Sequence, residues 1–157
     1  MPRSLPLALI LLTYAAAQIP DKPAGYLADA AGVVEAQEAK AIEQRCAELD
    51  RAGRAQVAIV IVRSLQGQPI EKVALTLFKK WGIGRKNVND GLLLMLAIQE
   101  RKSRLTVGYG LEKIVTDDVA AGILHEMAPS LRAGHYGAAL NRALDLLGAR
   151  LAPAHAQ

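Results

Sequence analysis

The chain of 157 residues has one cysteine, Cys46, and few aromatic residues, which make up 4% of the sequence. A single cysteine cannot form an intramolecular disulfide, so burial of apolar side chains must stabilise the fold. The formal net charge is only +4, and no basic stripe is interleaved with aromatics, which argues against nucleic-acid binding. Apolar residues make up 52% and charged residues 22%, a composition typical of one globular domain with its own core.

The sequence also lacks an apolar run that spans a bilayer comfortably, which takes about 20 residues. Its N-terminal apolar run, Leu5 to Thr13, follows Arg3 and precedes the small residues Ala15 to Ala17. This order is typical of a secretory signal peptide, which we assign to residues 1–17. The sequence therefore predicts a periplasmic or secreted protein with no transmembrane segment in the mature chain.

The remaining chain divides into three parts. Residues 18–34 contain prolines and a glycine that disfavour regular structure, and we expect an extended lead-in there. Residues 35–151 are expected to form one α/β domain. Residues 152–157 are expected to be a frayed tail.

Within the domain, helical and strand patterns alternate. Four segments have apolar residues at three- and four-residue spacing, which predicts amphipathic helices. They are 35–51, 70–81, 117–131 and 136–151. Short apolar or β-branched runs predict strands at 56–62, 92–98 and 104–109. Pro129 is expected to kink or split the third helix.

The order of these elements predicts the fold class. A strand–helix–strand sequence implies a parallel pair, and the short link between the last two strands implies an antiparallel hairpin. We therefore expect an α/β protein in which a mixed β-sheet has helices packed on both faces, as an α/β/α sandwich.

Four motifs stand in the order and approximate spacing of a known family. They are Tyr26-Leu-Ala-Asp-Ala-Ala-Gly32, Trp81-Gly-Ile-Gly84, Asn89-Asp-Gly-Leu-Leu-Leu94 and Val107-Gly-Tyr-Gly-Leu-Glu112. Through them, the chain resembles the TPM domain family, which includes a thylakoid lumen protein, a photosystem II repair protein and a receptor modulator. The resemblance implies an α/β sandwich and an exported or lumenal location. It also implies calcium binding, acid phosphatase activity or an accessory role in membrane complexes.

Acidic residues in and near these motifs are candidate ligands of a divalent cation. They are Asp29, Asp90, Glu112 and Asp117. Calcium takes six to eight oxygen ligands, which carboxylates and loop carbonyls usually supply. Asp90 enters one predicted strand and Glu112 follows the next, so a hairpin would place both at one end of the sheet. Alternatively, Asp29 and Asp90 form turns, Asp117 lies in the first turn of a helix, and Glu112 is a surface charge.

Two functions are consistent with this sequence. The first is an exported accessory module that binds a divalent cation, expected to be calcium, and assembles with an envelope or membrane protein complex. The second is a weak metal-dependent acid phosphatase, in which Asp29 or Asp90 holds a metal and Arg85, Lys86 or Arg104 holds phosphate oxygens. The sequence contains neither a P-loop nor a Gly-x-Ser-x-Gly motif, which favours the accessory module.

Overall fold

The computed structural model describes residues 19–153, so the predicted signal peptide and the last residues of the predicted tail lie outside the described range. The elements in chain order are β1 (Leu27–Asp29), α1 (Ala36–Arg51), β2 (Gln56–Val62), α2 (Ile70–Lys80), β3 (Gly91–Ala97), β4 (Lys102–Val107), the 3₁₀ turn η1 (Tyr109–Leu111), α3 (Asp117–Arg132) and α4 (Tyr136–Leu151). Within the described range, no helix is both long enough and apolar enough to cross a membrane.

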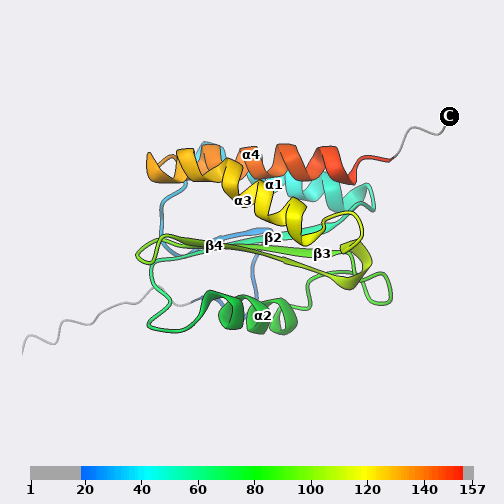
Figure 1. Ribbon diagram of the computed structural model, residues 1–157, viewed down its shortest axis with the longest axis horizontal. Coiled ribbons are helices and arrows are strands. Elements are labelled where there is room, and N and C mark those ends of the chain that lie inside the picture. Colours follow the sequence, from blue (N-terminus) through cyan, green and yellow to red (C-terminus); the bar gives the residue numbers. More distant parts are fainter. Residues whose placement is uncertain (1–18, 154–157) are drawn as a thin grey trace, which may run out of the picture.

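The four strands form one mixed sheet in the order β1-β2-β3-β4. The first three strands are parallel, and β4 pairs antiparallel with β3. Helices α1, α3 and α4 cover one face of the sheet and α2 covers the other (Figure 1). The predicted α/β fold, with a mixed sheet and helices on both faces, is confirmed.

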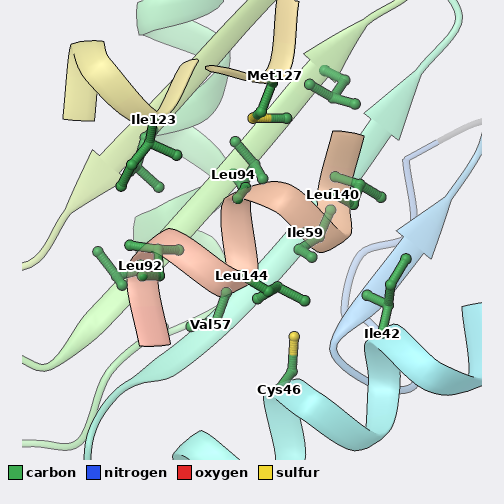
Figure 2. Close-up of a cluster of buried hydrophobic side chains, with 14 of the residues drawn as sticks. Ile42, Cys46, Val57, Ile59, Leu92, Leu94, Ile123, Met127, Leu140 and Leu144 are labelled. Carbon is green, nitrogen blue, oxygen red and sulfur yellow. The ribbon is translucent and has the colours of Figure 1, made fainter. Parts of the chain in front are cut away.

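Apolar side chains form one core on each side of the sheet. The larger core joins β2 and β3 to α1, α3 and α4, and Figure 2 shows Ile59 and Leu94 of the sheet among side chains such as Met127 and Leu144. The smaller core lies under α2 and contains Val60 and other alternate residues of the same strands. Both central strands are thus buried on both faces, which explains their unbroken apolar sequences.

The edge strand β1 differs from the prediction of an extended lead-in. Leu27 pairs with Ile59 and Asp29 with Ile61, in parallel register. The carboxylate of Glu43 in α1 accepts hydrogen bonds from the backbone N–H groups of Tyr26 and Leu27, at 3.0 and 2.7 Å. A side chain distant in sequence therefore holds this strand, and no local pattern indicates it.

Helix α3 runs without a break through Pro129, so the proline does not split it. A proline inside a helix removes a hydrogen bond to the carbonyl group four residues earlier, which belongs here to His125. Pro129 and His125 are both exposed, so the turn lies on the solvent side of the helix. Thr116 caps the start of the helix as predicted, its Oγ1 accepting from the N–H of Val119 at 3.3 Å.

The two strand–helix–strand crossovers have opposite hands. Both advance in the same direction across the sheet, from β1 to β2 and from β2 to β3. The first crosses over the face covered by α1 and the second over the face covered by α2. One of them therefore departs from the right-handed rule that nearly all such units follow.

Candidate functional site

The four predicted cation ligands are divided between the two ends of the sheet. Asp29 ends β1 level with Ile61, whereas Asp90 precedes Gly91, which is level with Gln56. The step from residue 56 to residue 61 along β2 spans about 17 Å at 3.3 Å per residue. The structure therefore does not bring Asp29 to the end of the sheet that holds Asp90.

Asp29 has the contacts of a turn-forming residue. Its carboxylate accepts hydrogen bonds from the backbone N–H groups of Gly32 and Val34, both at 2.8 Å. Both oxygens are thus used to close the turn between β1 and α1. These contacts agree with the alternative that Asp29 forms a turn, and they require no cation.

Asp90 is buried, with 3% of its surface exposed, and is paired with Arg85. It accepts hydrogen bonds at 2.8 Å from the backbone N–H and from Nε of Arg85, and a further one from Nη2. Burial raises the pKa of Asp90, but the hydrogen bonds and the charge of Arg85 outweigh burial and hold this pKa below its ordinary value. Asp90 is therefore ionised at neutral pH, with both oxygens engaged by Arg85.

Three of the family-like motifs meet beside this ion pair because their glycines allow backbones to touch. A Cβ atom added at Gly91 would lie 2.5 Å from the carbonyl oxygen of Ile83, and one at Gly108 would lie 2.5 Å from that of Asn89. At Gly110 the added Cβ would lie 2.0 Å from the carbonyl oxygen of Val88. Only glycine allows contacts this close, so the loops at this end of the sheet are packed backbone to backbone.

A chain of hydrogen bonds links the fourth motif to the same end. The hydroxyl of Tyr26 donates to Asp50 at 2.7 Å, and Nε2 of Gln56 donates to the same carboxylate at 3.3 Å. Oε1 of Gln56 accepts from the N–H of Gly84 at 3.0 Å. The sequence analysis did not predict this network. The one feature of the sequence that hints at it is a polar residue, Gln56, at the start of an otherwise apolar strand.

Large apolar side chains are exposed on these loops. Tyr109 is 82% exposed, Val88 53% and Ile114 43%. The loops of Val88 and Tyr109 are joined by a hydrogen bond of 2.9 Å from the N–H of Gly110 to the carbonyl of Asn89. We refer to Val88, Tyr109 and Ile114 as the apolar tip.

A groove of about 690 Å³ runs between β4 and the first half of α3. Its lining includes Glu112, Asp117 and Arg104. The structure therefore brings two of the four predicted cation ligands to one groove. Arg104, which was predicted to hold phosphate, borders this groove at the strand edge, with its side chain on the α2 face. Across residues 19–153, no group of three or more His, Cys, Asp or Glu side chains is arranged to hold a metal ion.

The single cysteine has the properties of a core residue. Cys46 is fully buried among the side chains between α1 and the sheet (Figure 2). Burial, followed by the charge of Glu43, raises the pKa of the thiol to about 12. Its thiolate is therefore not formed at neutral pH, and it does not supply a nucleophile.

Solved structures of bacterial proteins share this fold. The N-terminal domain of a P. gingivalis protein is 28% identical, with a TM-score of 0.74 over 80% of this chain and 81% of that chain. The N-terminal domain of the cg2496 protein from Corynebacterium glutamicum is 15% identical, with a TM-score of 0.64 over 87% and 88%. The BA42 protein from Bizionia argentinensis is 15% identical, with a TM-score of 0.66 over 75% and 81%.

The comparison with protein families agrees with the four motifs. No curated protein matches the chain. The model of the TPM domain matches residues 27–150. This match covers most of the chain and includes every helix and strand described above, apart from the last residue of α4. The chain belongs to the TPM domain family.

Proposed function

We propose that this protein is an exported accessory module that docks onto a protein complex of the cell envelope through its apolar tip. The observation that carries the proposal is the exposure of Tyr109 and Val88 on two loops whose backbones are packed together. Tyrosine is enriched in protein interfaces because its ring gives a large contact area and its hydroxyl gives a hydrogen bond.

The rigidity of the loops supports a docking role. Asp90 and Arg85 close the loop that carries Val88, and Gly110 holds the Tyr109 turn against it. Loops that are already ordered lose little conformational entropy when they bind, so more of the contact energy appears as affinity. The exposed Lys86 and Lys113 near the tip would form a polar rim around it.

The phosphatase alternative has less support in the described residues. Two of the three guanidinium nitrogens of Arg85 donate to Asp90, which leaves only Nη1 to bind phosphate. Asp29, the other predicted metal ligand of that mechanism, lies at the opposite end of the sheet. An accessory role requires no such catalytic set.

Calcium binding is a second candidate, on a narrower set of ligands than the sequence predicted. Glu112 and Asp117 line the same groove, and loop carbonyls there would supply further oxygens. Arg104 borders that groove at the strand edge, but its side chain lies on the α2 face of the sheet with Met95, so its charge does not point at the two carboxylates. Calcium bound between the two carboxylates would hold the turn before α3, beside the apolar tip.

The docking proposal is tested by crosslinking in cells. A photoreactive phenylalanine analogue would replace Tyr109 or Val88, and in a control it would replace Leu75, which is 46% exposed on α2. The tip positions should give the same envelope-protein adduct, and position 75 should not. The purified partner should then bind the Val88→Ser, Tyr109→Ser double variant at least tenfold more weakly than Leu75→Ser. Equal adducts at all three positions would refute docking through the tip.

The calcium candidate is tested by calorimetric titration of the full chain and three variants. Glu112→Gln and Asp117→Asn should each abolish saturable binding, and Asp29→Asn should leave it unchanged. Hydrolysis of p-nitrophenyl phosphate would be followed in the same samples and in a further variant, Asp90→Asn. Turnover that is lost in folded Asp90→Asn would favour the phosphatase instead.

A further inference from the structure

Strand β4 forms one edge of the sheet, and its outer side carries unpaired backbone groups. The N–H of Gly108 donates to the carbonyl oxygen of Gly91 on β3 at 2.8 Å. In an antiparallel pair every second residue faces the partner strand, so the N–H and C=O groups of residues 106, 104 and 102 also point towards β3. Alternation along an antiparallel strand then directs those of Ser103, Leu105 and Val107 outwards. Among residues 19–153, none of these outward groups has a hydrogen-bond partner. Such an edge is a template for a further strand.

The space beside this edge is open. The groove of about 690 Å³ between β4 and α3 runs along Leu105 and Val107, which belong to the core on the α3 side of the sheet. Its opposite wall includes Val115, which precedes α3, and Ala120 and Leu124 of α3. A strand placed along β4 would therefore point every second side chain into this groove, where Val115, Ala120 and Leu124 offer apolar contacts beside the acidic Glu112 and Asp117.

The other face of the same edge is cationic. Because side chains alternate along a strand, Lys102 and Arg104 lie on the α2 side, opposite to Leu105. Both side chains are exposed, and within the described part of the chain neither forms an ion pair. An added strand would place its remaining side chains directly beside these two charges.

We propose that β4 binds an extended segment of a partner protein, in which apolar residues alternate with acidic ones, as a fifth strand. Main-chain hydrogen bonds to Ser103, Leu105 and Val107 would provide affinity, as in other cases of strand addition. The alternation would provide specificity, because acidic side chains face Lys102 and Arg104 while apolar ones enter the groove. This interaction does not depend on the apolar tip.

Charge complementarity favours this partner over a second copy of the chain. Two β4 edges joined to each other would bring the Lys102 and Arg104 side chains of both copies to one seam. Like charges on neighbouring strands destabilise the pairing. The same charges on an edge strand discourage self-association, yet they attract an acidic segment.

The test uses a capped synthetic peptide of about eight residues, long enough to span β4, in which valine alternates with glutamate. A control peptide has lysine in place of glutamate. Each is titrated into the full ¹⁵N-labelled chain and followed by NMR. The glutamate peptide should bind at least about fivefold more tightly, the factor expected from one good cross-strand charge pair. It should also slow hydrogen exchange at the amides of Ser103, Leu105 and Val107.

Two variants locate the binding site on β4. Ser103→Pro removes one outward N–H group, which an edge strand tolerates, and should weaken binding at least threefold relative to Ser103→Ala. Arg104→Glu should weaken binding of the glutamate peptide and strengthen binding of the lysine peptide. The Val88→Ser, Tyr109→Ser variant should bind the glutamate peptide as the parent does, which separates this site from the apolar tip.

Several results would overturn the proposal. They are absence of saturable binding, equal affinity for the two peptides, equal affinity of Ser103→Pro and Ser103→Ala, and shifts centred away from β4. Protection of the same amides without peptide, rising with protein concentration, would assign the edge to a second copy instead.

Discussion

Arg85 donates to both carboxylate oxygens of Asp90, from its backbone N–H to Oδ1 and from its guanidinium to Oδ2. The two residues close the loop that carries Val88. The backbone carbonyl of Asp90 also accepts a hydrogen bond from the N–H of Gln56 at 2.9 Å, so the loop is attached to the start of β2 as well. The position of the apolar tip therefore depends on a buried charge.

Replacing Asp90 with asparagine should lower the free energy of unfolding at pH 7 by about 2 kcal/mol, because hydrogen bonds to a charged carboxylate are lost. The pKa of Asp90 lies below its ordinary value in the folded state. A lowered folded pKa gives stability that is present above the unfolded pKa of about 4 and is lost as pH falls through the folded value. Urea unfolding from pH 7 to pH 2 should show the parent and the variant converging in acid. A gap that stays constant would contradict this role of the charge.

Gly110→Ala should destabilise the protein by about 1–3 kcal/mol, because the added methyl group collides with the backbone of Val88 and forces the loops apart. Gly148→Ala is the matched control, since nothing lies within 4 Å of a Cβ added there. This control should raise stability by up to about 1 kcal/mol, as alanine favours a helix. Thermal melting of both variants measures the difference, and equal effects would show that the loop contact has no energetic role.

Cys46 should be unreactive in the folded protein. Its thiol is fully buried, and burial raises its pKa to about 12. An aromatic disulfide reagent at pH 8 should therefore label it only as fast as the protein unfolds, and labelling should become rapid in concentrated urea. Rapid labelling without denaturant would show that the α1 side of the core opens readily.

Glu43→Ala should release β1 from α1, because the lost carboxylate accepts hydrogen bonds from Tyr26 and Leu27. Hydrogen exchange at the amide of Leu27 should increase at least tenfold, while amides in β3 stay protected. Glu48→Ala, an exposed change on the same helix, is the control and should leave Leu27 unchanged. Unchanged exchange in the Glu43 variant would show that pairing with β2 alone holds the edge strand.

Local patterns predicted most of the fold. The bounds of β2 and α4 agree with the sequence analysis residue for residue, because an unbroken β-branched run and a regular apolar stripe each identify one kind of element. Strand β1 was missed because it has three residues and is held by Glu43, far away in the sequence. Contacts of this kind leave no periodic signal.

The candidate site was harder to predict than the fold. The hairpin does place Asp90 and the turn that leads to Glu112 at one end of the sheet, as its length suggested. The sequence did not show that Asp90 would be buried against Arg85, since that pairing depends on the shape of the loop between them. Asp29 lies at the opposite end because β1 is parallel to β2, and a strand that is not foreseen has no predicted direction.

The unequal division of helices between the two faces has a consequence for how the molecule opens. Three helices secure one side, while a single helix of 11 residues, α2, secures the other. Releasing α2 would uncover Val60, Met95 and their neighbours, yet it would leave the larger core intact. We expect the release of α2 to be the local unfolding event of lowest free energy. One face of the sheet would then stay covered while the other face opens transiently.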